Sequence, residues 1–342
     1  MVQKTTKLGG TASDVVVSRV AHGLMLMTWK PTPVPDEQCF EAIKAGVDAL
    51  PAGTKMLLNS AEFYGPTRGT TNLELLARFY EKYPDYADKT FVVVKGGFNA
   101  ATFGPDSSPE FLRSSADNCQ RALGPRKKVD VYEPARVDKR FSIEDTMKVL
   151  VELKNEGKFD HIGLSECSAE TLRRANAIHP VTTVEIEVSA FSYEEETAKV
   201  IAAATELGST ILAYSPLGRG LLTGTVASVS EFPEGDMRHR FSRYKDENMK
   251  HNLMIVDELK TFAATKGITV GQLCIAWVAA QSPVVVPIPG SSKASRTLEN
   301  LEAGDVELSA ADVQKVTDII AKHGVKGDRG DGRSADELHQ WG

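Results

Sequence analysis

A tyrosine and a lysine that follow two separate apolar runs have the side chains needed for proton transfer. Tyr64 lies in the segment NSAEFYG (residues 59–65), directly after the apolar residues 56–58, and Lys95 directly follows the apolar run 91–94. An ammonium group beside a phenol favours the phenolate, lowers the phenol pKa and makes the tyrosine a better general acid near neutral pH. Each residue alone has an ordinary explanation, since loop tyrosines usually pack their rings and lysines at strand ends often reach solvent.

Short apolar runs alternate with longer amphipathic segments along most of the chain. This alternation, with continuously apolar strands, predicts a parallel sheet covered by helices. A doubly wound sheet would give the same alternation, but eight strands with polar residues repeatedly placed just after them favour a (β/α)8 TIM barrel, an α/β fold. The predicted strands are residues 20–26, 55–59, 91–95, 129–133, 160–164, 182–187, 210–214 and 284–288. The polar residues after them are Tyr64, Lys95, Arg136, Ser165, Glu185 and Tyr214.

Two segments outside this alternation are predicted to cover the ends of the barrel. Residues 7–19 carry two glycines between alternating polar stretches, which predicts an N-terminal hairpin over one end. Residues 217–252 are longer than an ordinary connection and rich in Gly, Arg, His and Asp, so we expect a functional lid after the seventh strand.

The whole chain, residues 1–342, is predicted to form a single domain with the barrel over about residues 15–322. Residues 309–322 are the expected final helix, and residues 323–342 are expected to be a mobile tail because glycines and alternating charges follow it. The Arg329-Gly330-Asp331 triplet in this tail resembles a cell-adhesion motif, but chance explains it better, and we assign it no function.

Composition excludes several classes of partner. The 342 residues are 42% hydrophobic and 25% charged with a net charge of -6, which provides no basic surface for nucleic acid or anionic membranes. The four cysteines are scattered and the seven histidines match no ligand spacing, so neither a disulfide framework nor a metal site is expected. We expect a cytoplasmic monomer or weak oligomer that acts on a small molecule; the sequence does not distinguish the cytoplasm from the nucleus.

Five segments in order along the chain carry a family resemblance. They are residues 59–65, Val94-Lys95-Gly96, Ile162-Gly163-Leu164-Ser165, residues 213–224 (AYSPLGRGLLTG), and residues 287–292 (PIPGSS) with Glu299-Asn300. Together they resemble the aldo-keto reductases over about residues 15–322. Within that family the sequence is most similar to the fungal pyridoxal reductases, on residues 23–25, 28–31, 62–65 and 135–138. The resemblance implies a (β/α)8 barrel that binds NADPH without a Rossmann domain and reduces an aldehyde.

The resemblance implies that Tyr64 is the proton donor and Lys95 its partner, but two neighbouring positions depart from the family. Asn59 stands where an aspartate is usual, and Ala135 where a histidine is usual. Asn59 can hydrogen-bond the lysine without neutralising it, so we expect the ammonium to polarise Tyr64 at least as strongly. Ala135 can donate nothing, and Arg136 is a candidate substitute donor if it points inward.

The resemblance also implies three groups of cofactor contacts. Ser165, Glu166, Glu185 and Tyr214 fall at the nicotinamide end, Ser215, Pro216, Leu217, Arg219 and Gly220 at the pyrophosphate, and Gly290, Ser292, Lys293, Arg296, Glu299 and Asn300 at the adenosine end. Thr28 is a further cofactor contact that the resemblance implies. Glu166 and Glu185 replace a usual asparagine and glutamine, and some of these carboxylates could instead be solvent-facing or paired with Lys or Arg. The hydroxyl and two cations at 292, 293 and 296 favour NADPH over NADH, against the alternative of an ordinary capped surface helix.

Trp29, Phe63 and Arg136 are the candidate substrate contacts. An aromatic wall suits a planar ring, although it suits any aryl aldehyde equally. The leading reaction is therefore the reduction of pyridoxal to pyridoxine with Tyr64 as general acid. A broad-specificity aldehyde or ketone reductase of the same family, and a non-catalytic NADPH-binding regulatory subunit, remain the alternatives.

Overall fold

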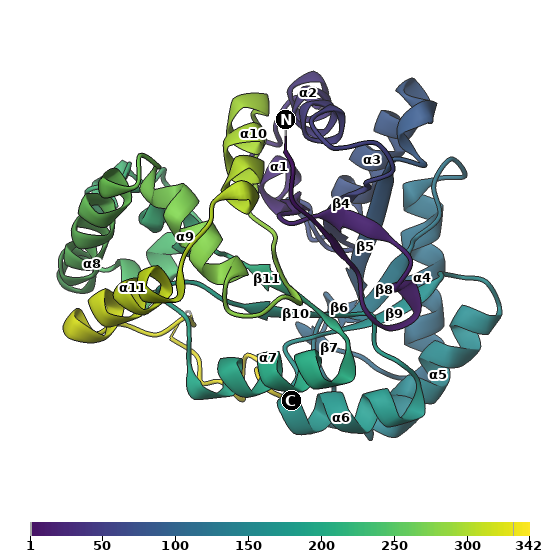
Figure 1. Cartoon of the computed structure of the whole chain (residues 1–342). Helices are drawn as coiled ribbons and strands as arrows, with labels where there is room; N and C mark the ends of the chain where they lie inside the picture. Colours follow the sequence, from purple (N-terminus) through teal and green to yellow (C-terminus); the bar gives the residue numbers. More distant parts are fainter. Residues whose placement is uncertain (1, 331) are drawn as a thin grey trace.

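Eight parallel strands form a sheet that curls around and meets itself in the computed structural model (Figure 1), which describes residues 2–330 and 332–342. The strands are, in spatial order, β3 (His22–Gly23), β4 (Met56–Ala61), β5 (Thr90–Gly96), β8 (Val131–Pro134), β9 (His161–Ser165), β10 (Thr183–Glu187), β11 (Thr210–Tyr214) and β12 (Val285–Pro287). The Ala21 and Gly23 N–H groups donate to the carbonyl oxygens of Pro287 and Pro289 at 2.8 and 3.1 Å, and so join the first strand to the last. The predicted (β/α)8 barrel is confirmed.

Helices lie around the outside of this sheet (Figure 1). They are α2 (Asp36–Asp48), α3 (Thr71–Lys82), α4 (Pro109–Leu123), α5 (Ile143–Asn155), α6 (Ala169–Ile178), α7 (Glu195–Leu207), α8 (Asp246–Thr265), α9 (Val270–Ala279), α10 (Ala294–Glu302) and α11 (Ala310–His323), with the single turn α1 (Met25–Thr28) after β3. Side-chain N-caps begin several of them, because a hydroxyl oxygen satisfies a free N–H of the first turn. Ser142, Ser168, Thr269 and Ser309 cap α5, α6, α9 and α11 in this way.

Successive residues of each strand point alternately toward the surrounding helices and into the barrel, and so form two apolar layers. Even-numbered residues of β5, such as Val92 and Val94, pack against the helices, whereas Phe91 and Val93 point into the barrel. Leu57, Val131, Leu212, Val286 and Ile288 fill the interior with them. Both faces of the barrel strands are therefore covered, which explains why these strands are continuously apolar rather than alternating. The same parity sends Lys95, two residues after Val93, into the barrel.

The predicted N-terminal hairpin is confirmed and closes the end of the barrel where the strands begin. It consists of β1 (Thr5–Lys7) and β2 (Val16–Ser18), joined through the turn Gly10–Ala12. The Gly9 N–H donates to Thr210 Oγ1 at 2.8 Å, and a Cβ on Gly9 would lie 2.1 Å from the Gly208 carbonyl oxygen, so only glycine fits there. The opposite end, where the strands finish, stays available for chemistry.

The predicted strands agree with the structure to within two residues at either end, except for the first. Residues 20–26 form only the two-residue β3, because the chain turns into α1 at Met25. The expected lid 217–252 consists of short 3-10 turns, η3 (Gly218–Thr223), η4 (Val229–Glu231), η5 (Met237–Arg240) and η6 (Ser242–Tyr244), and ends early because α8 starts at Asp246. A small hairpin, β6 (Phe98–Asn99) with β7 (Gly104–Pro105), follows β5.

The C-terminal segment after α11 is packed against the barrel, contrary to the expectation of a mobile tail. Asn252 on α8 both donates to the Lys326 carbonyl and accepts from its N–H, each at 2.9 Å. The Gly342 N–H donates to the Glu166 carbonyl at 3.3 Å, and its carbonyl accepts from Ser168. Arg329 is only 7% exposed, so the first residue of the adhesion-like triplet is buried; Asp331 lies outside the described residues.

No single helix within residues 2–330 and 332–342 is long and apolar enough to span a membrane. Helices α8 and α9 reach that length and hydropathy only when taken together, and they meet at an angle of 90°.

Candidate active site

Four polar side chains from four strands meet inside the barrel near the ends of the strands. Asn59 on β4, Lys95 on β5, Glu133 on β8 and Glu185 on β10 are all buried. The strand register explains the meeting, because Lys95 pairs with Glu133 on the neighbouring strand. Asn59 and Glu185 stand at positions of their own strands whose side chains also point into the barrel. This polar layer lies above the apolar filling of the barrel.

Lys95 is held by two partners within this layer. Its Nζ donates to Asn59 Oδ1 at 2.8 Å and to Glu185 Oε2 at 2.9 Å. The Asn59 amide nitrogen in turn donates to the same Glu185 oxygen at 2.6 Å. The sequence predicts Glu185 beside the nicotinamide and Lys95 without a neutralising carboxylate; the structure corrects the second point, because Glu185 reaches Lys95 from across the barrel.

Tyr64 lies in the loop after β4, directly above Lys95. The Lys95 Nζ is 5.0 Å from the centre of the Tyr64 ring, and the tyrosine is 7% exposed. Burial raises the pKa of Tyr64, and this outweighs the opposing effect of the Lys95 charge. The sequence predicts a lowered phenol pKa, so the lysine acts in the expected direction but does not decide the outcome. Tyr64 is therefore neutral and carries its proton near neutral pH.

The pKa of Lys95 reflects the same competition. Burial alone would lower it, but the charge of Glu185, with a further contribution from Tyr64 once the phenol ionises, outweighs burial, so the pKa lies above the ordinary lysine value and the ammonium form persists. Burial, together with the nearby Glu185 charge, raises the pKa of Glu133 well above its usual range and favours its neutral acid. Glu133 Oε2 accepts from Thr183 Oγ1 at 3.1 Å. Gly163 leaves room for this carboxyl, since a Cβ there would lie 2.6 Å from Glu133 Oε2.

A buried hydrogen-bond network fixes the backbone of the Tyr64 loop. Thr28 Oγ1 donates to the Tyr64 carbonyl at 2.6 Å, and Asn72 Nδ2 donates to Thr28 Oγ1 at 2.8 Å. Ser60 Oγ donates to Asn72 Oδ1 at 2.7 Å. The sequence assigns Thr28 to the cofactor, and the structure adds a second task for it, since its hydroxyl holds the tyrosine in place. Sequence reasoning missed Asn72, which gives no motif signal.

Aromatic rings form a wall beside Tyr64. The predicted substrate residues Trp29 and Phe63 lie 5.4 and 5.5 Å from the Tyr64 ring, measured between ring centres. Phe98, which the sequence analysis did not identify, continues the wall at 5.0 Å from Phe63, and Phe103 follows at 5.6 Å from Phe98. These rings come from three different loops at the same end of the barrel.

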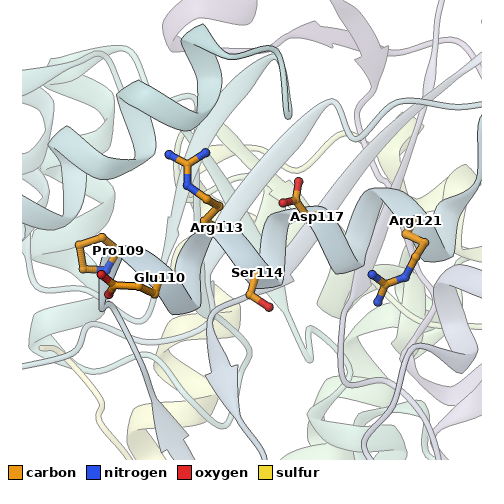
Figure 2. Close-up of a pocket in the computed structure, with 6 residues that line it drawn as sticks. All are labelled: Pro109, Glu110, Arg113, Ser114, Asp117 and Arg121. Carbon is orange, nitrogen blue, oxygen red and sulfur yellow. The ribbon is translucent and has the colours of Figure 1, made fainter.

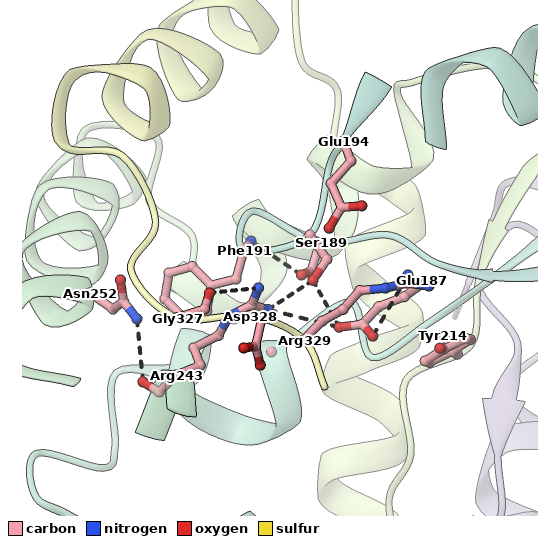
Figure 3. Close-up of polar contacts among 12 residues, drawn as sticks. Glu187, Ser189, Phe191, Glu194, Tyr214, Arg243, Asn252, Gly327, Asp328 and Arg329 are labelled. Carbon is pink, nitrogen blue, oxygen red and sulfur yellow. Dashed lines mark hydrogen bonds and ion pairs between the residues drawn. The ribbon is translucent and has the colours of Figure 1, made fainter. Parts of the chain in front are cut away.

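The expected nicotinamide corner contains Arg329 from the C-terminal segment, which lies near Glu187 and Tyr214 (Figure 3). Arg329 Nη2 donates to Glu166 Oε2, and Tyr214 donates its hydroxyl to Glu166 Oε1 at 2.8 Å. Ser165 Oγ is buried and has no hydrogen-bond partner among the described residues. The sequence predicts Glu166 as a nicotinamide contact, with a solvent-facing or a Lys- or Arg-paired carboxylate as the alternatives. The structure shows Glu166 buried and paired with Arg329, so it is not solvent-facing.

Glu187 joins the same cluster to the long segment after β11. Arg243 Nη1 and Arg329 Nη1 each lie 4.0 Å from a Glu187 oxygen. Ser192 Oγ accepts from Arg243 at 2.8 Å and donates to Glu187 Oε1 at 2.9 Å. Figure 3 shows the two arginines reaching this carboxylate from different parts of the chain. Two carboxylates at the barrel mouth are thus matched by two cations that sequence reasoning did not place.

Arg136, a predicted substrate contact, lies under the end of the C-terminal segment. Its Nε donates to the Leu338 carbonyl at 3.2 Å. Trp341 lies near Arg329, whose guanidinium carbon is 4.8 Å from a Trp341 ring centre. The C-terminal residues therefore cover the mouth beside β8 and β9.

The predicted pyrophosphate residues form a tight turn after β11. Ser215, Arg219 and Gly220 all have positive φ, of 51°, 52° and 99°, and this curls the backbone. The Arg219 guanidinium stacks 4.4 Å from the centre of the Phe241 ring. Pro216 and Leu217 lie within the same turn, and the Leu217 carbonyl accepts from the Gly220 N–H at 2.9 Å.

The predicted adenosine residues gather at the start of α10. Gly290 and Ser292 precede the helix, and Lys293 is its N-cap residue. Arg296 Nη1 pairs with Glu299 Oε2 at 2.8 Å, so both are already engaged on the surface. Asn300 Nδ2 is buried and has no hydrogen-bond partner in the described part of the chain.

Other candidate sites are weaker. A surface hollow on α4 (Figure 2) is lined by Pro109, Glu110, Arg113, Ser114, Asp117 and Arg121. Two of its charged groups are engaged in surface ion pairs, Arg113 with Glu156 and Asp117 with Lys158. Within residues 2–330 and 332–342, no group of three or more His, Cys, Asp or Glu side chains is arranged to hold a metal ion.

Comparison with known proteins agrees with this geometry. The family model described as "Aldo/keto reductase family" matches residues 19–321. The chain belongs to the aldo-keto reductase family. It is 36% identical to "Probable pyridoxal reductase 2" of Schizosaccharomyces pombe over 316 residues, covering 91% of this chain and 94% of the relative. It is 39% identical to "Aldo-keto reductase yakc [NADP(+)]" of the same yeast over 277 residues, 79% of this chain and 80% of that one.

A solved structure gives the same result. The glycerol dehydrogenase AKR11B4 of Gluconobacter oxydans superimposes with a TM-score of 0.81 at 25% identity, covering 96% of this chain and 99% of the other. The aldo-keto reductase is thus an oxidoreductase for small carbonyl compounds that depends on a nicotinamide dinucleotide, and the residues around Tyr64 are its candidate active site.

Proposed function

We propose that this aldo-keto reductase uses NADPH to reduce an aldehyde to an alcohol, with pyridoxal as the leading substrate and Tyr64 as the proton donor. The observation that carries the proposal is the position of Tyr64, buried between the Lys95–Glu185 pair and a wall of aromatic rings. A phenol that remains protonated at neutral pH can donate to a carbonyl oxygen, and an adjacent ammonium stabilises the phenolate that forms.

Two orphaned polar atoms support the cofactor assignment. Ser165 Oγ and Asn300 Nδ2 are buried at opposite ends of the expected dinucleotide site, and neither has a partner among the described residues. Buried polar atoms are rarely left unpaired, so these two fit a ligand that hydrogen-bonds at both ends. When bound, NADPH supplies a hydride to the carbonyl carbon. Tyr64 gives its phenolic proton to the carbonyl oxygen, while Lys95 holds the resulting phenolate.

The preference for NADPH rests on the start of α10. Lys293 and Arg296 lie at the first turn of the helix, where the backbone N–H groups and the side-chain cations suit a phosphate. Arg296 exchanges its surface pairing with Glu299 for this phosphate. The NADP(+) in the name of the yeast relative that is 39% identical agrees with this assignment.

Pyridoxal fits the two unusual features of the site. The wall of Trp29, Phe63 and Phe98 offers a flat apolar surface to a planar ring. Ala135, at the end of β8, provides no donor for the carbonyl oxygen. A phenolic hydroxyl ortho to the aldehyde, as in pyridoxal, makes an internal hydrogen bond that polarises and orients the carbonyl in place of a donor from the protein. The relative that is named a pyridoxal reductase supports this choice.

A single assay series tests the function. NADPH consumption is followed at 340 nm with pyridoxal, 4-nitrobenzaldehyde and a quinone, in the wild type and in Tyr64→Phe, which keeps the packed ring but lacks the proton. We expect the highest kcat/KM for pyridoxal and a loss of about 100- to 10,000-fold in the variant, the usual contribution of a general acid. Unchanged NADPH binding, followed by fluorescence, shows that the variant site is intact.

The outcomes separate the alternatives. Equal kcat/KM values across the three substrates would indicate a broad carbonyl reductase instead. A wild-type protein that binds NADPH but oxidises it with none of them would refute the catalytic proposal in favour of a binding role. A Tyr64→Phe variant with wild-type kcat would remove Tyr64 from the mechanism.

A further inference from the structure

We propose that Glu185 is the positioning residue that keeps Lys95 charged and in place beneath Tyr64, so that the counter-charge of the catalytic lysine comes from β10 rather than from β4. This inference rests on the proposed role of Tyr64 as proton donor and concerns how the same site is held. It differs from the cofactor contact that the sequence predicts for Glu185.

The geometry of the three side chains is that of a closed network. Lys95 Nζ lies 2.8 Å from Asn59 Oδ1 and 2.9 Å from Glu185 Oε2, and Asn59 Nδ2 lies 2.6 Å from the same carboxylate oxygen. The Lys95 and Glu185 side chains are 4% and 5% exposed. An ammonium so deeply buried is strongly destabilised unless an anion contacts it, and Glu185 supplies that contact.

The amide of Asn59 completes this arrangement. An amide accepts a hydrogen bond at its oxygen and donates from its nitrogen, so Asn59 serves the ammonium and the carboxylate at once. An aspartate at that position would face Glu185 with a second negative charge at hydrogen-bond distance, which is unfavourable in a buried site. A carboxylate at position 185 on β10 therefore favours an amide, rather than a second carboxylate, at position 59 on β4.

The other titratable groups around Lys95 do not replace Glu185. Tyr64 faces the lysine from the loop after β4 and is neutral. Glu133 faces it from β8, but its Oε2 accepts from Thr183 and its Oε1 has no partner among the described residues. With Glu133 in its neutral acid form, Glu185 is the acidic side chain that contacts Lys95, and the two form the ion pair of this buried layer.

The pair also affects Tyr64. The negative charge of Glu185 acts with burial to keep the Tyr64 proton bound, in opposition to the Lys95 charge. Loss of Glu185 would either let Lys95 lose its proton at a lower pH, because the largest charge that opposes burial is then gone, or lower the pKa of Tyr64. With either change, the Tyr64–Lys95 pair loses a proton at a lower pH than in the wild type. Either change therefore lowers the rate of reduction on the alkaline side of the pH profile.

The test uses Glu185→Gln, Asn59→Asp and the double variant. Glu185→Gln introduces the glutamine that is usual in the family at this position, where it contacts the nicotinamide. If Glu185 only contacts the cofactor, this variant should bind NADPH as tightly as the wild type or more tightly, and the pH profile of its kcat should not change. Our proposal predicts a lower kcat, with the alkaline limb of its pH profile moved to lower pH by at least about one unit. The double variant returns a carboxylate to Lys95 from β4 and should recover most of both losses.

A second measurement reads Lys95 without any catalysis. The protein is labelled with 13C at the lysine ε carbon, and the Lys95 resonance is identified by its absence in Lys95→Met. In the wild type, we expect this resonance to report an ammonium up to about pH 10. In Glu185→Gln it should titrate at a lower pH, and in the double variant the titration should move back toward the wild-type pH. Glu133→Gln is the matched control on the neighbouring strand and should move this titration less than Glu185→Gln does.

Three results would overturn the proposal. One is a Glu185→Gln variant whose Lys95 titration and kcat pH profile both match the wild type, whatever its KM for NADPH. Another is a folded double variant that recovers neither the kcat profile nor the titration. The third is a Glu133→Gln variant that moves the titration as far as Glu185→Gln. Failure to reduce pyridoxal would refute the proposed substrate and leave the NMR result standing on its own.

Discussion

Removing the guanidinium of Arg329 should loosen the C-terminal segment and destabilise the barrel mouth. Arg329 and Glu166 have side chains 4% and 0% exposed, and Glu187 lies 4.0 Å from the same arginine. The variant Arg329→Met keeps the length of the side chain but leaves both carboxylates without this cation. Breaking a buried ion pair by removing one partner costs about 3–5 kcal/mol.

This cost translates into a measurable temperature shift. Unfolding entropy near 60 °C is about 2.1 cal/mol/K per residue, so 342 residues give about 0.7 kcal/mol/K. The expected decrease in Tm for Arg329→Met is therefore about 4–7 °C by calorimetry. If the segment detaches before the barrel unfolds, part of the effect appears instead as faster amide exchange over residues 324–342.

A double-mutant cycle gives the control. Glu166→Gln alone leaves Arg329 facing only the more distant Glu187, whereas Glu166→Gln with Arg329→Met removes both charges of the contact. We expect the double variant to be more stable than the sum of the two single effects predicts, by about 1.5 kcal/mol or more, because no unpaired buried charge remains at position 166. The reasoning fails if Arg329→Met melts at the wild-type temperature and its C-terminal segment exchanges no faster.

Three further results are expected. Arg296→Ala should weaken NADPH binding about 10- to 100-fold, measured by fluorescence titration, and NADH binding much less, since only NADPH carries the 2'-phosphate; equal losses would refute the assignment. Ala135→His should raise kcat/KM more for an unactivated aldehyde than for pyridoxal, and equal gains would rule out assistance from the substrate's own hydroxyl. Burial lowers the pKa of His22 from 6.5 to about 4 despite its bond to the Ser291 carbonyl. The unfolded chain therefore takes up this proton first, the free energy of unfolding falls by about 3 kcal/mol as the pH drops from 6.5 to 4, and His22→Gln should lack this part of the pH dependence in urea unfolding.

The strands and the Tyr64–Lys95 meeting were accessible from sequence because they depend on local patterns. Continuous apolar runs mark strands buried on both faces, and a barrel brings the ends of neighbouring strands together. The first strand was overestimated because the apolar residues from 24 onward form part of a helical turn, and apolar character alone does not separate the two.

The Lys95–Glu185 pair was missed because it joins strands that are not neighbours in the sheet. The two residues are far apart in the sequence, and no motif links them. The alternation of inward- and outward-pointing residues along β5 and β10 would, however, have placed both side chains in the same interior layer. Arg329 was missed for a different reason. Glycines and charges around it are typical of a mobile segment, and only the unmatched carboxylates at Glu166 and Glu187 indicated that buried cations were needed.

The location of the lysine counter-charge also constrains how such a site can change, one substitution at a time. Moving the carboxylate from β10 to β4 requires both Asn59→Asp and Glu185→Gln, and the two orders are not equivalent. With Glu185→Gln first, the intermediate has a buried ammonium and no anion in contact with it. With Asn59→Asp first, it has two carboxyl groups at one lysine, and one of them can relieve the repulsion by taking up a proton. Laboratory evolution toward the alternative arrangement should therefore acquire Asn59→Asp before Glu185→Gln, and Glu185→Gln alone should impair the enzyme more than Asn59→Asp alone.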